Sequence, residues 1–319
     1  MSISIKFELH IHINKCESKK QEKTSSVSKL NFLQAAETEV ERLQASLSQS
    51  TTENYKTALR ALKRYMKQDI DISQVNQQLM KGFERWLRDQ GLCTNSISCY
   101  MRSIRSLLNR IKGENPTHAF DGVYTGRAKT EKRAITEADI TSIKQTQLRP
   151  QSFLCLVRDI FLFSYYALGM PFVDIAFLRR HQITDQQLVY HRHKTGQRVV
   201  VPLEPCMLEI INRYQSDSGY VFPLLKSNNP QKAYQEYLLM LNHYNRSLKT
   251  LARKAGLSLR LTSYTARHTW ASVAYGANVD LPVISKALGH TNPQTTLTYI
   301  KEINDNRLAE ANRIIVNRL

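Results

Sequence analysis

The chain has 319 residues, and its 45 lysines and arginines against 27 aspartates and glutamates give a formal charge of +18. This length suits two ordinary domains, and the excess of positive charge favours a nucleic-acid partner over a merely soluble basic protein. No run approaches the ~20 apolar residues of a membrane helix, which excludes a membrane-spanning protein. The five cysteines are widely spaced and contain no CxxC pair, so we expect free thiols in a reducing cytoplasm.

Residues 1–28 are expected to form an N-terminal extension. Apolar and polar residues alternate over residues 1–15, which predicts a single strand with one apolar face and argues against a signal peptide. Residues 16–28 are rich in lysine and serine and are expected to be a tether.

Residues 29–113 are expected to form a bundle of four amphipathic helices joined by short loops. The expected helices are 31–47, one beginning at Thr51 or Thr52, 74–90, and one that starts after Thr94 and stops at Gly113. The second and fourth helices each carry a strongly basic face, which favours contact with phosphates over a merely solvated face. These candidate DNA-binding residues are Lys56, Arg60, Lys63, Arg64, Lys67, Arg102, Arg105, Arg110 and Lys112.

Residues 114–133 form an expected flexible basic linker, poor in apolar periodicity. A second domain is expected over residues 134–306, opening with a capping-box pattern at Thr136. Its remaining elements are an apolar helix at 152–168, a helix from Pro171 to Arg180, a β-hairpin of strands 187–192 and 198–202, and helices at 204–214 and 231–255.

The segment 261–301 places three groups that can handle a phosphate near the ends of short helices. Thr262 or Ser263 can cap a helix that runs to Gly276, a second lies between Asp280 and Gly289, and a third opens at Asn292-Pro293. The three groups are Arg267 in the first helix, His290 after the second and Tyr299 at the end of the third.

In order and spacing, this segment resembles the tyrosine recombinase (phage integrase) family. The resemblance rests on Ala287-Leu288-Gly289-His290 followed by Thr296-Leu297-Thr298-Tyr299, and it covers residues 30–301. It implies a mainly α fold with a small β-sheet, in which a helical core-binding domain precedes a catalytic domain. It also implies an enzyme for site-specific DNA recombination, acting on double-stranded DNA as a homotetramer, with room for an accessory DNA-bending protein.

The resemblance assigns roles to five residues. Tyr299 is the expected nucleophile, forming a 3′-phosphotyrosyl link, and Arg267 and His290 bind the phosphate. Lys194, in the Lys194-Thr195-Gly196 turn of the hairpin, is expected to protonate the leaving 5′-oxygen. Tyr264 stands where the family most often has a histidine. The sequence contains no P-loop and no acidic cluster with metal-binding spacing, so we expect no cofactor, no ATP and no metal.

One departure from the family pattern concerns its first catalytic arginine. The glycine segment carries Pro171 at the usual place and Leu168 at the alternative one, although Asp174 is retained. Losing one such donor typically costs about a hundred-fold in rate. The candidates to replace it are Arg158, Arg179, Arg180 and Arg192, and the sequence places none of them there. Arg192, between His191 and His193, is otherwise expected to face DNA, and a zinc site is not expected.

These departures leave alternatives open. One rival is a catalytically weak or inactive DNA-binding relative, and a topoisomerase-like enzyme is a weaker one. The outcome of recombination, whether integration, excision or inversion, stays open, and so does the target site. A C-terminal helix over residues 307–319 has an apolar stripe that suits either its own domain or a neighbouring protomer.

Overall fold

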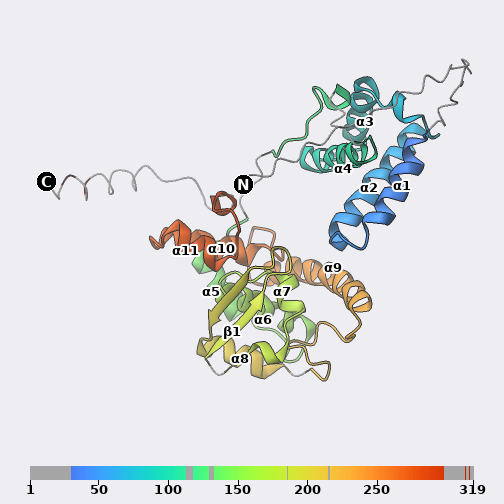
Figure 1. Ribbon diagram of the computed structural model, residues 1–319. Coiled ribbons are helices and arrows are strands. Elements are labelled where there is room, and N and C mark those ends of the chain that lie inside the picture. The colour runs from blue at the N-terminus through green and yellow to red at the C-terminus, as the bar shows by residue number, and fades with distance from the viewer. Residues whose placement is uncertain are drawn as a thin grey trace, which may run out of the picture. The chain divides into compact units, whose positions relative to one another are not determined.

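The computed structural model describes residues 30–112, 118–128, 133–184, 186–214 and 216–297, together with Arg313 and Val316 (Figure 1). The chain divides into two compact units, residues 1–129 and 130–319, and each has a hydrophobic core of its own. The expected strand and tether of residues 1–28, Tyr299 and most of the expected C-terminal helix lie outside the described residues. Within the described residues, no helix is long and apolar enough to span a membrane.

The first unit is helical, as the apolar periodicity predicts. Its α-helices are α1 Phe32–Leu43, α2 Gln49–Met66, α3 Gln77–Asp89 and α4 Thr94–Lys112, with 3-10 turns at Ile72–Gln74 and His118–Phe120. Polar side chains fix two of the starts: Ser48 accepts a hydrogen bond from the Thr51 amide, and Asn76 accepts one from the Leu79 amide. Helices α1, α2 and α4 pack on one another, and α3 packs on α4 and on the second 3-10 turn.

Residues 118–128 differ from the expected open linker. Phe120 and Val123 are buried in the core of the first unit. The Ser98 hydroxyl of α4 donates to the Gly126 carbonyl, and the Asn95 side chain bonds to both the amide and the carbonyl of Ala128. Two apolar residues without a repeating period carry too little signal for sequence reasoning, yet they dock this stretch against the bundle.

The second unit combines helices with one small sheet. Its elements are α5 Glu137–Gln145, α6 Phe153–Tyr166, α7 Phe172–Ala176, a 3-10 turn Arg180–Gln182, β1 Gln187–His191, β2 Arg198–Pro202, α8 Pro205–Arg213, α9 Pro230–Lys254, α10 Thr265–Gly276, α11 Leu281–Ala287 and α12 Gln294–Leu297. The expected mainly α fold with a small β-sheet is confirmed. Thr136 caps α5 with both bonds of a capping box, as predicted.

Helix α6 is the centre of this unit, and α5, α7, α8, α9 and α10 all contact it (Figure 1). Its apolar side chains surround the helix instead of forming one stripe, which is typical of a helix buried on all sides. Asp159, a buried carboxylate on α6, accepts hydrogen bonds from Arg158 and Tyr214 and pairs with Arg213. This cluster joins α6 to the end of α8.

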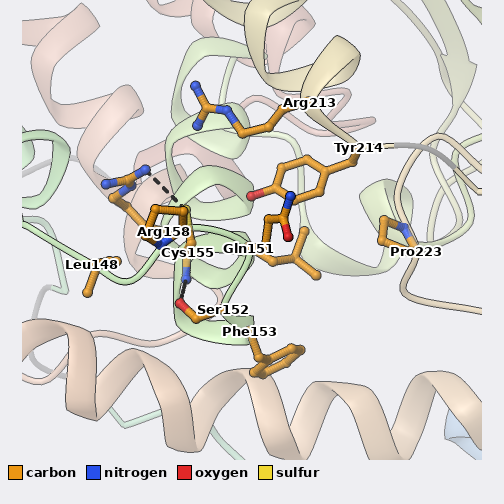
Figure 2. Close-up of a pocket in the computed structure, with 11 residues that line it drawn as sticks. Leu148, Gln151, Ser152, Phe153, Cys155, Arg158, Arg213, Tyr214 and Pro223 are labelled. Atoms are coloured by element: carbon orange, nitrogen blue, oxygen red, sulfur yellow. Dashed lines mark hydrogen bonds between the residues drawn. The ribbon is translucent and has the colours of Figure 1, made fainter.

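A cavity of about 770 Å³ lies beside the Asp159 cluster (Figure 2). Figure 2 shows Arg158 and Tyr214 on its wall, together with Phe153 from the first turn of α6. Arg158, one of the candidates to replace the missing arginine, lines this cavity, whereas Arg267, His290, Lys194 and Tyr264 do not.

The two strands form the predicted hairpin. They are antiparallel, with Leu188 opposite Val201 and Tyr190 opposite Val199. These four side chains are buried, whereas the alternate positions face outward. This alternation fixes the register, because a shift by one residue would expose the whole buried set. The register therefore fixes the place of the turn that carries Lys194.

The segment around Arg267 folds into the three expected short helices. Helix α10 ends at Gly276 as predicted, although Tyr264 rather than Thr262 or Ser263 occupies its N-cap position. Asp280 precedes α11, and Gly289, with φ +61°, follows its end. Helix α12 is short and ends at Leu297.

Candidate active site

Arg267 occupies the centre of the candidate site and is almost fully buried, with 1% of its surface exposed. Its Nη1 donates to the Gly169 carbonyl at 2.9 Å, and its Nη2 donates to the Leu288 carbonyl at 2.5 Å. The same Nη2 lies 3.1 Å from Nε2 of His290. Buried guanidinium groups need such partners, and here they fix the fork at one position and orientation.

The turn before α7 allows this close approach to Arg267. Leu168 and Gly169 both adopt positive φ angles, +57° and +69°. A Cβ atom on Gly169 would lie 3.0 Å from the Cα and 3.1 Å from the Cγ of Arg267. Glycine is therefore required for its conformation and for the space it leaves. The chain keeps the glycine turn of the family, but Pro171 supplies no positive charge where the family has an arginine.

His290 lies between Arg267 and α12. Its Nε2 faces the arginine and its Nδ1 lies 2.9 Å from Oγ1 of Thr296. Because a guanidinium has only donors, Nε2 must accept, so the neutral ring carries its hydrogen on Nδ1 and Thr296 accepts it. Burial, and after it the charges of Arg267, Arg192 and Lys194, together lower the pKa of His290 to about 4. These cations create a positive field at the ring, and the histidine is neutral at pH 7.

Arg192 was one of the four candidates to replace the missing arginine and was otherwise expected to face DNA. Only 7% of its surface is exposed, and this burial is what the sequence did not predict. Its Nε lies 2.9 Å from a carboxylate oxygen of Asp174, and its Nη1 donates at 3.0 Å to the Leu288 carbonyl. Burial raises the pKa of Asp174, while the charges of Arg192 and Arg267 oppose that rise. The carbonyl of Leu288 thus accepts from both arginines and brings two guanidinium groups side by side.

The other arginines considered as replacements are engaged elsewhere. Arg158 binds Asp159 and the Thr146 carbonyl. Arg179 lies over the ring of Tyr220, at 3.6 Å from its centre, and Arg180 donates to the Tyr214 carbonyl. Of the four candidates, only Arg192 shares a hydrogen-bond partner with Arg267.

The hairpin tip reaches the end of α11. The Thr195 hydroxyl donates to the Gly289 carbonyl at 3.2 Å, and Gly196 adopts φ +67° in the turn. A Cβ on Gly289 would lie 2.8 Å from Cγ of Arg192, so the two segments pack closely. Lys194 is exposed in this turn, near enough for its charge to lower the pKa of His290. The structure therefore brings Lys194, Arg192 and His290 together.

Tyr264 occupies the N-cap position of α10 with 45% of its surface exposed. It precedes Arg267 by three residues, a spacing that places two side chains on the same side of a helix. Its neighbour Tyr237 has a pKa of about 12, raised by burial and then by the proximity of Tyr264. Tyr264 thus stands beside the buried site, at its solvent edge.

The predicted nucleophile, Tyr299, lies outside the described residues. The described chain ends its third short helix at Leu297, two residues earlier, and the fully buried Thr296 fixes this end through His290. Among the described residues, no group of three or more histidine, cysteine, aspartate or glutamate side chains could hold a metal ion.

The basic residues of the first unit have a different setting. Those of α2 and α4 are exposed or half-buried. Glu53 pairs with Lys56 at 3.7 Å and with Arg60 at 3.4 Å, and Glu37 of α1 pairs with Lys63 at 3.6 Å. The α2 face is therefore less free of acidic groups than the sequence pattern indicates. The guanidinium of Arg64 lies 5.6 Å from the centre of the Trp86 ring.

The comparison with protein families matches both units. Residues 31–112 match the phage integrase SAM-like domain, and residues 131–305 match the phage integrase family. The chain belongs to the phage integrase family. This member of the family is a site-specific tyrosine recombinase, an enzyme that breaks and rejoins DNA.

Relatives with curated names are distant in sequence. The tyrosine recombinase XerD of Oceanobacillus iheyensis is 24% identical over 277 residues, which cover 81% of this chain and 89% of the relative. The tyrosine recombinase XerA of Pyrococcus horikoshii is 26% identical over 207 residues, which cover 62% of this chain and 70% of the relative.

Solved structures of two integrases share the fold. The Tn1549 transposon integrase in complex with transposon right end DNA superposes with a TM-score of 0.66 at 15% identity, covering 90% of this chain and all of that one. A lambda integrase dimer bound to a COC′ core site gives 0.61 at 16% identity, covering 85% and 95%. Lambda integrase has also been solved as a tetramer bound to a Holliday junction, with a TM-score of 0.61 at 16% identity and coverage of 86% and 79%.

Proposed function

We propose that this recombinase cuts DNA through Tyr299 at a phosphate site whose two arginines are Arg267 and Arg192. The observation that carries the proposal is the Leu288 carbonyl, which accepts hydrogen bonds from both guanidinium groups. Arg192 supplies from the hairpin the charge that the family takes from its glycine segment, where Pro171 stands here. The replacement keeps two arginines in the site and changes the element that provides one of them.

The electrostatics of the site support an anionic ligand. Arg192 pairs with Asp174, whereas Arg267 bonds to two carbonyl groups and to a neutral histidine. Burial, and after it the positive charges of Arg267, Arg192 and Lys194, lower the pKa of His290 to about 4. A phosphodiester of the DNA backbone carries one negative charge and accepts hydrogen bonds on its two non-bridging oxygens, so it suits this positively charged site.

The reaction that this site would perform has two balanced steps. In the first, Tyr299 loses its phenolic proton to solvent, its oxygen attacks phosphorus, the bond from phosphorus to the 5′-oxygen breaks, and Lys194 gives that oxygen a proton. In the second, the 5′-hydroxyl of a partner strand returns a proton to Lys194 and attacks the 3′-phosphotyrosyl link; the DNA strand is resealed, and the tyrosine leaves and takes a proton from solvent. Each step replaces one phosphoester bond with another, so neither needs ATP.

The other predicted residues have supporting roles. Tyr264 would donate a hydrogen bond in the position of the family's usual histidine, and its exposure at the start of α10 supports this role. The basic residues of α2 and α4 would hold double-stranded DNA through its phosphates. Lambda integrase is found as a tetramer on a Holliday junction, and we extend that homotetramer to this chain, acting on DNA in a bacterial cytoplasm.

A covalent-trapping experiment tests the proposal. The full chain is incubated with nicked duplexes that carry the junctions flanking its own gene, and protein–DNA adducts are resolved on a denaturing gel. We expect an adduct with the wild-type chain and none with Tyr299→Phe. An adduct that persists in Tyr299→Phe would assign the nucleophile elsewhere, and none on any junction would support the alternative of a DNA-binding relative without catalysis.

A further inference from the structure

Residues 122–128, which we call the docked segment, are tied to one face of α4. The fully buried Ser98 hydroxyl donates to the Gly126 carbonyl at 2.5 Å. The Asn95 side chain accepts from the Ala128 amide at 2.8 Å and donates to the carbonyl of the same residue at 3.1 Å. These three hydrogen bonds fix the backbone on both sides of the one residue that lies between the two anchored positions.

That intervening residue is Arg127, and its side chain is exposed. The anchoring residues Asn95 and Ser98 are followed, at intervals of three or four residues, by Arg102 and Arg105, so all four lie on one face of α4. The guanidinium of Arg105 also donates to a threonine hydroxyl of the docked segment at 3.5 Å. The docked segment therefore adds a further guanidinium to the basic face of α4.

This basic face differs in charge balance from that of α2. Helix α4 and the docked segment, all of whose residues the structure describes, contain no aspartate or glutamate. In the described part of the first unit, the ion pairs of lysine and arginine lie on α1, α2 and α3. Carboxylates thus offset positive charge on α2, whereas Arg102, Arg105 and Arg127 add their charges together, which favours a polyanion as ligand.

We propose that the docked segment extends the DNA-binding face of α4, with Arg127 contacting a backbone phosphate and with Asn95 and Ser98 as positioning residues. This inference rests on the proposed function, in which basic residues of the first unit hold double-stranded DNA. A duplex is the occupant that the charges favour, because it presents a continuous row of phosphates. An arginine on an anchored backbone loses less conformational freedom on binding than one on a free linker.

The docked segment also has a structural use, because Val123 is buried in the core of the first unit. That use does not involve the exposed side chain of Arg127. If the segment served the core alone, Arg127→Gln would leave the affinity for DNA unchanged. If Arg127 contacts a phosphate, the same substitution weakens binding and reduces its dependence on salt.

The first measurement is the affinity of the full chain for duplexes that carry the junctions flanking its own gene, by fluorescence anisotropy over a salt series. We expect Arg127→Gln to bind a few-fold more weakly and to reduce the slope of log affinity against log salt by about 0.9, and Arg127→Lys to keep that slope. The matched control is Arg42→Gln, which removes an exposed arginine of α1 bound to Glu39 at 2.7 Å and should leave the slope unchanged. An unchanged slope in Arg127→Gln, or an equal loss in the control, would overturn the proposal.

A double-mutant cycle tests the positioning role. Asn95→Ala/Ser98→Ala removes both anchors, faster hydrogen exchange of the Ala128 amide reports release of the segment, and thermal melting confirms the fold; Ser98→Ala alone serves if the double variant does not fold. In the released background, we expect the added loss of affinity from Arg127→Gln to shrink to less than about two-fold. The same loss in both backgrounds would overturn the positioning role.

The binding measurements and the covalent-trapping experiment separate the two proposals. If the salt and cycle effects appear but the wild type forms no adduct, the proposed reaction fails and the role of the docked segment stands. If the wild type forms the adduct but Arg127→Gln keeps the wild-type slope, the docked-segment proposal fails alone.

Discussion

Positively charged residues occur in two settings in this chain. In the second unit, Arg267 and Arg192 are buried and held by fixed carbonyl groups and the carboxylate of Asp174. In the first unit, residues such as Arg60 and Lys63 are exposed and pair loosely with exposed glutamates. Buried charges in a low-dielectric site are strong and geometrically exact, whereas exposed charges are screened by salt. The first setting suits one phosphate in one geometry, and the second suits affinity for a polyanion.

The largest expected effect is a loss of folding stability on removal of the Asp174 carboxylate, the negative charge beside the buried Arg192 and Arg267. Asp174→Asn leaves Arg192 and Arg267 without their negative neighbour, and loss of one partner of a buried ion pair typically destabilises by about 3–5 kcal/mol. Denaturant unfolding should show this loss, and the matched exposed control Asp217→Asn should not. Because removal of both charges relieves the penalty, Asp174→Asn/Arg192→Gln should be more stable than the sum of the single changes predicts.

Arg267→Lys should come next, since it tests geometry at constant charge. A lysine cannot reproduce the forked contacts to Gly169, Leu288 and His290, so adduct formation should fall by about 10²–10³-fold, or roughly 3–4 kcal/mol. The rate is measured on nicked duplexes. A lysine variant that cleaves at the wild-type rate would show that charge alone suffices.

A smaller effect is expected from the protonation of His290. Its pKa is about 4 in the folded chain and near 6.5 when unfolded, so between these values the unfolded state binds more protons. The stability that neutral His290 contributes is fully present above about pH 6.5 and is lost as the pH falls towards 4. The ring is only half-buried, so we expect a loss on the order of 1 kcal/mol. Unfolding free energies of wild type and His290→Gln between pH 7 and 4.5 should converge at the acid end; parallel curves would contradict the shifted pKa.

The smallest effect per residue is expected from the exposed basic residues of the first unit. Arg60→Gln and Lys63→Gln should each weaken DNA binding a few-fold and reduce the slope of log affinity against log salt by about 0.9. Their effect on folding stability should lie within about 1 kcal/mol, because exposed ion pairs contribute little. Fluorescence anisotropy over a salt series checks both statements. An unchanged slope would remove these residues from the DNA-contacting surface.

Local signals predicted much of this structure. A capping box marked the start of α5, Gly276 marked the end of α10, Asp280 and Gly289 bracketed α11, and alternation of apolar residues gave the hairpin and its turn. The motif residues Arg267 and His290 were found by their order along the chain, and the structure brings them within hydrogen-bond distance. Features that depend on neighbouring residues, such as helix ends and the hairpin, could therefore be predicted from the sequence.

The burial of Arg192 could not be predicted from local sequence patterns. It depends on Leu288, which lies 96 residues further along the chain, and on Asp174 in another element. In the sequence, Arg192 is one basic residue in a run of histidines and lysine, indistinguishable from an exposed one. Phe120 and Val123 were missed for a related reason, since two isolated apolar residues have no period. Leu168 and Pro171 at the expected arginine positions raised the question of a replacement, but the sequence did not place one.

The most direct test of the account compares two arginines of one hairpin, the buried Arg192 and the exposed Arg198. The measurement is the initial rate of covalent adduct formation for Arg192→Gln and Arg198→Gln, with thermal melting to confirm that both are folded. We predict that Arg192→Gln is slower by about 10²–10³-fold, as for loss of one donor to the transition state, while Arg198→Gln stays within a few-fold of wild type. A folded Arg192→Gln protein that cleaves as fast as wild type would contradict the claim that Arg192 replaces the missing arginine.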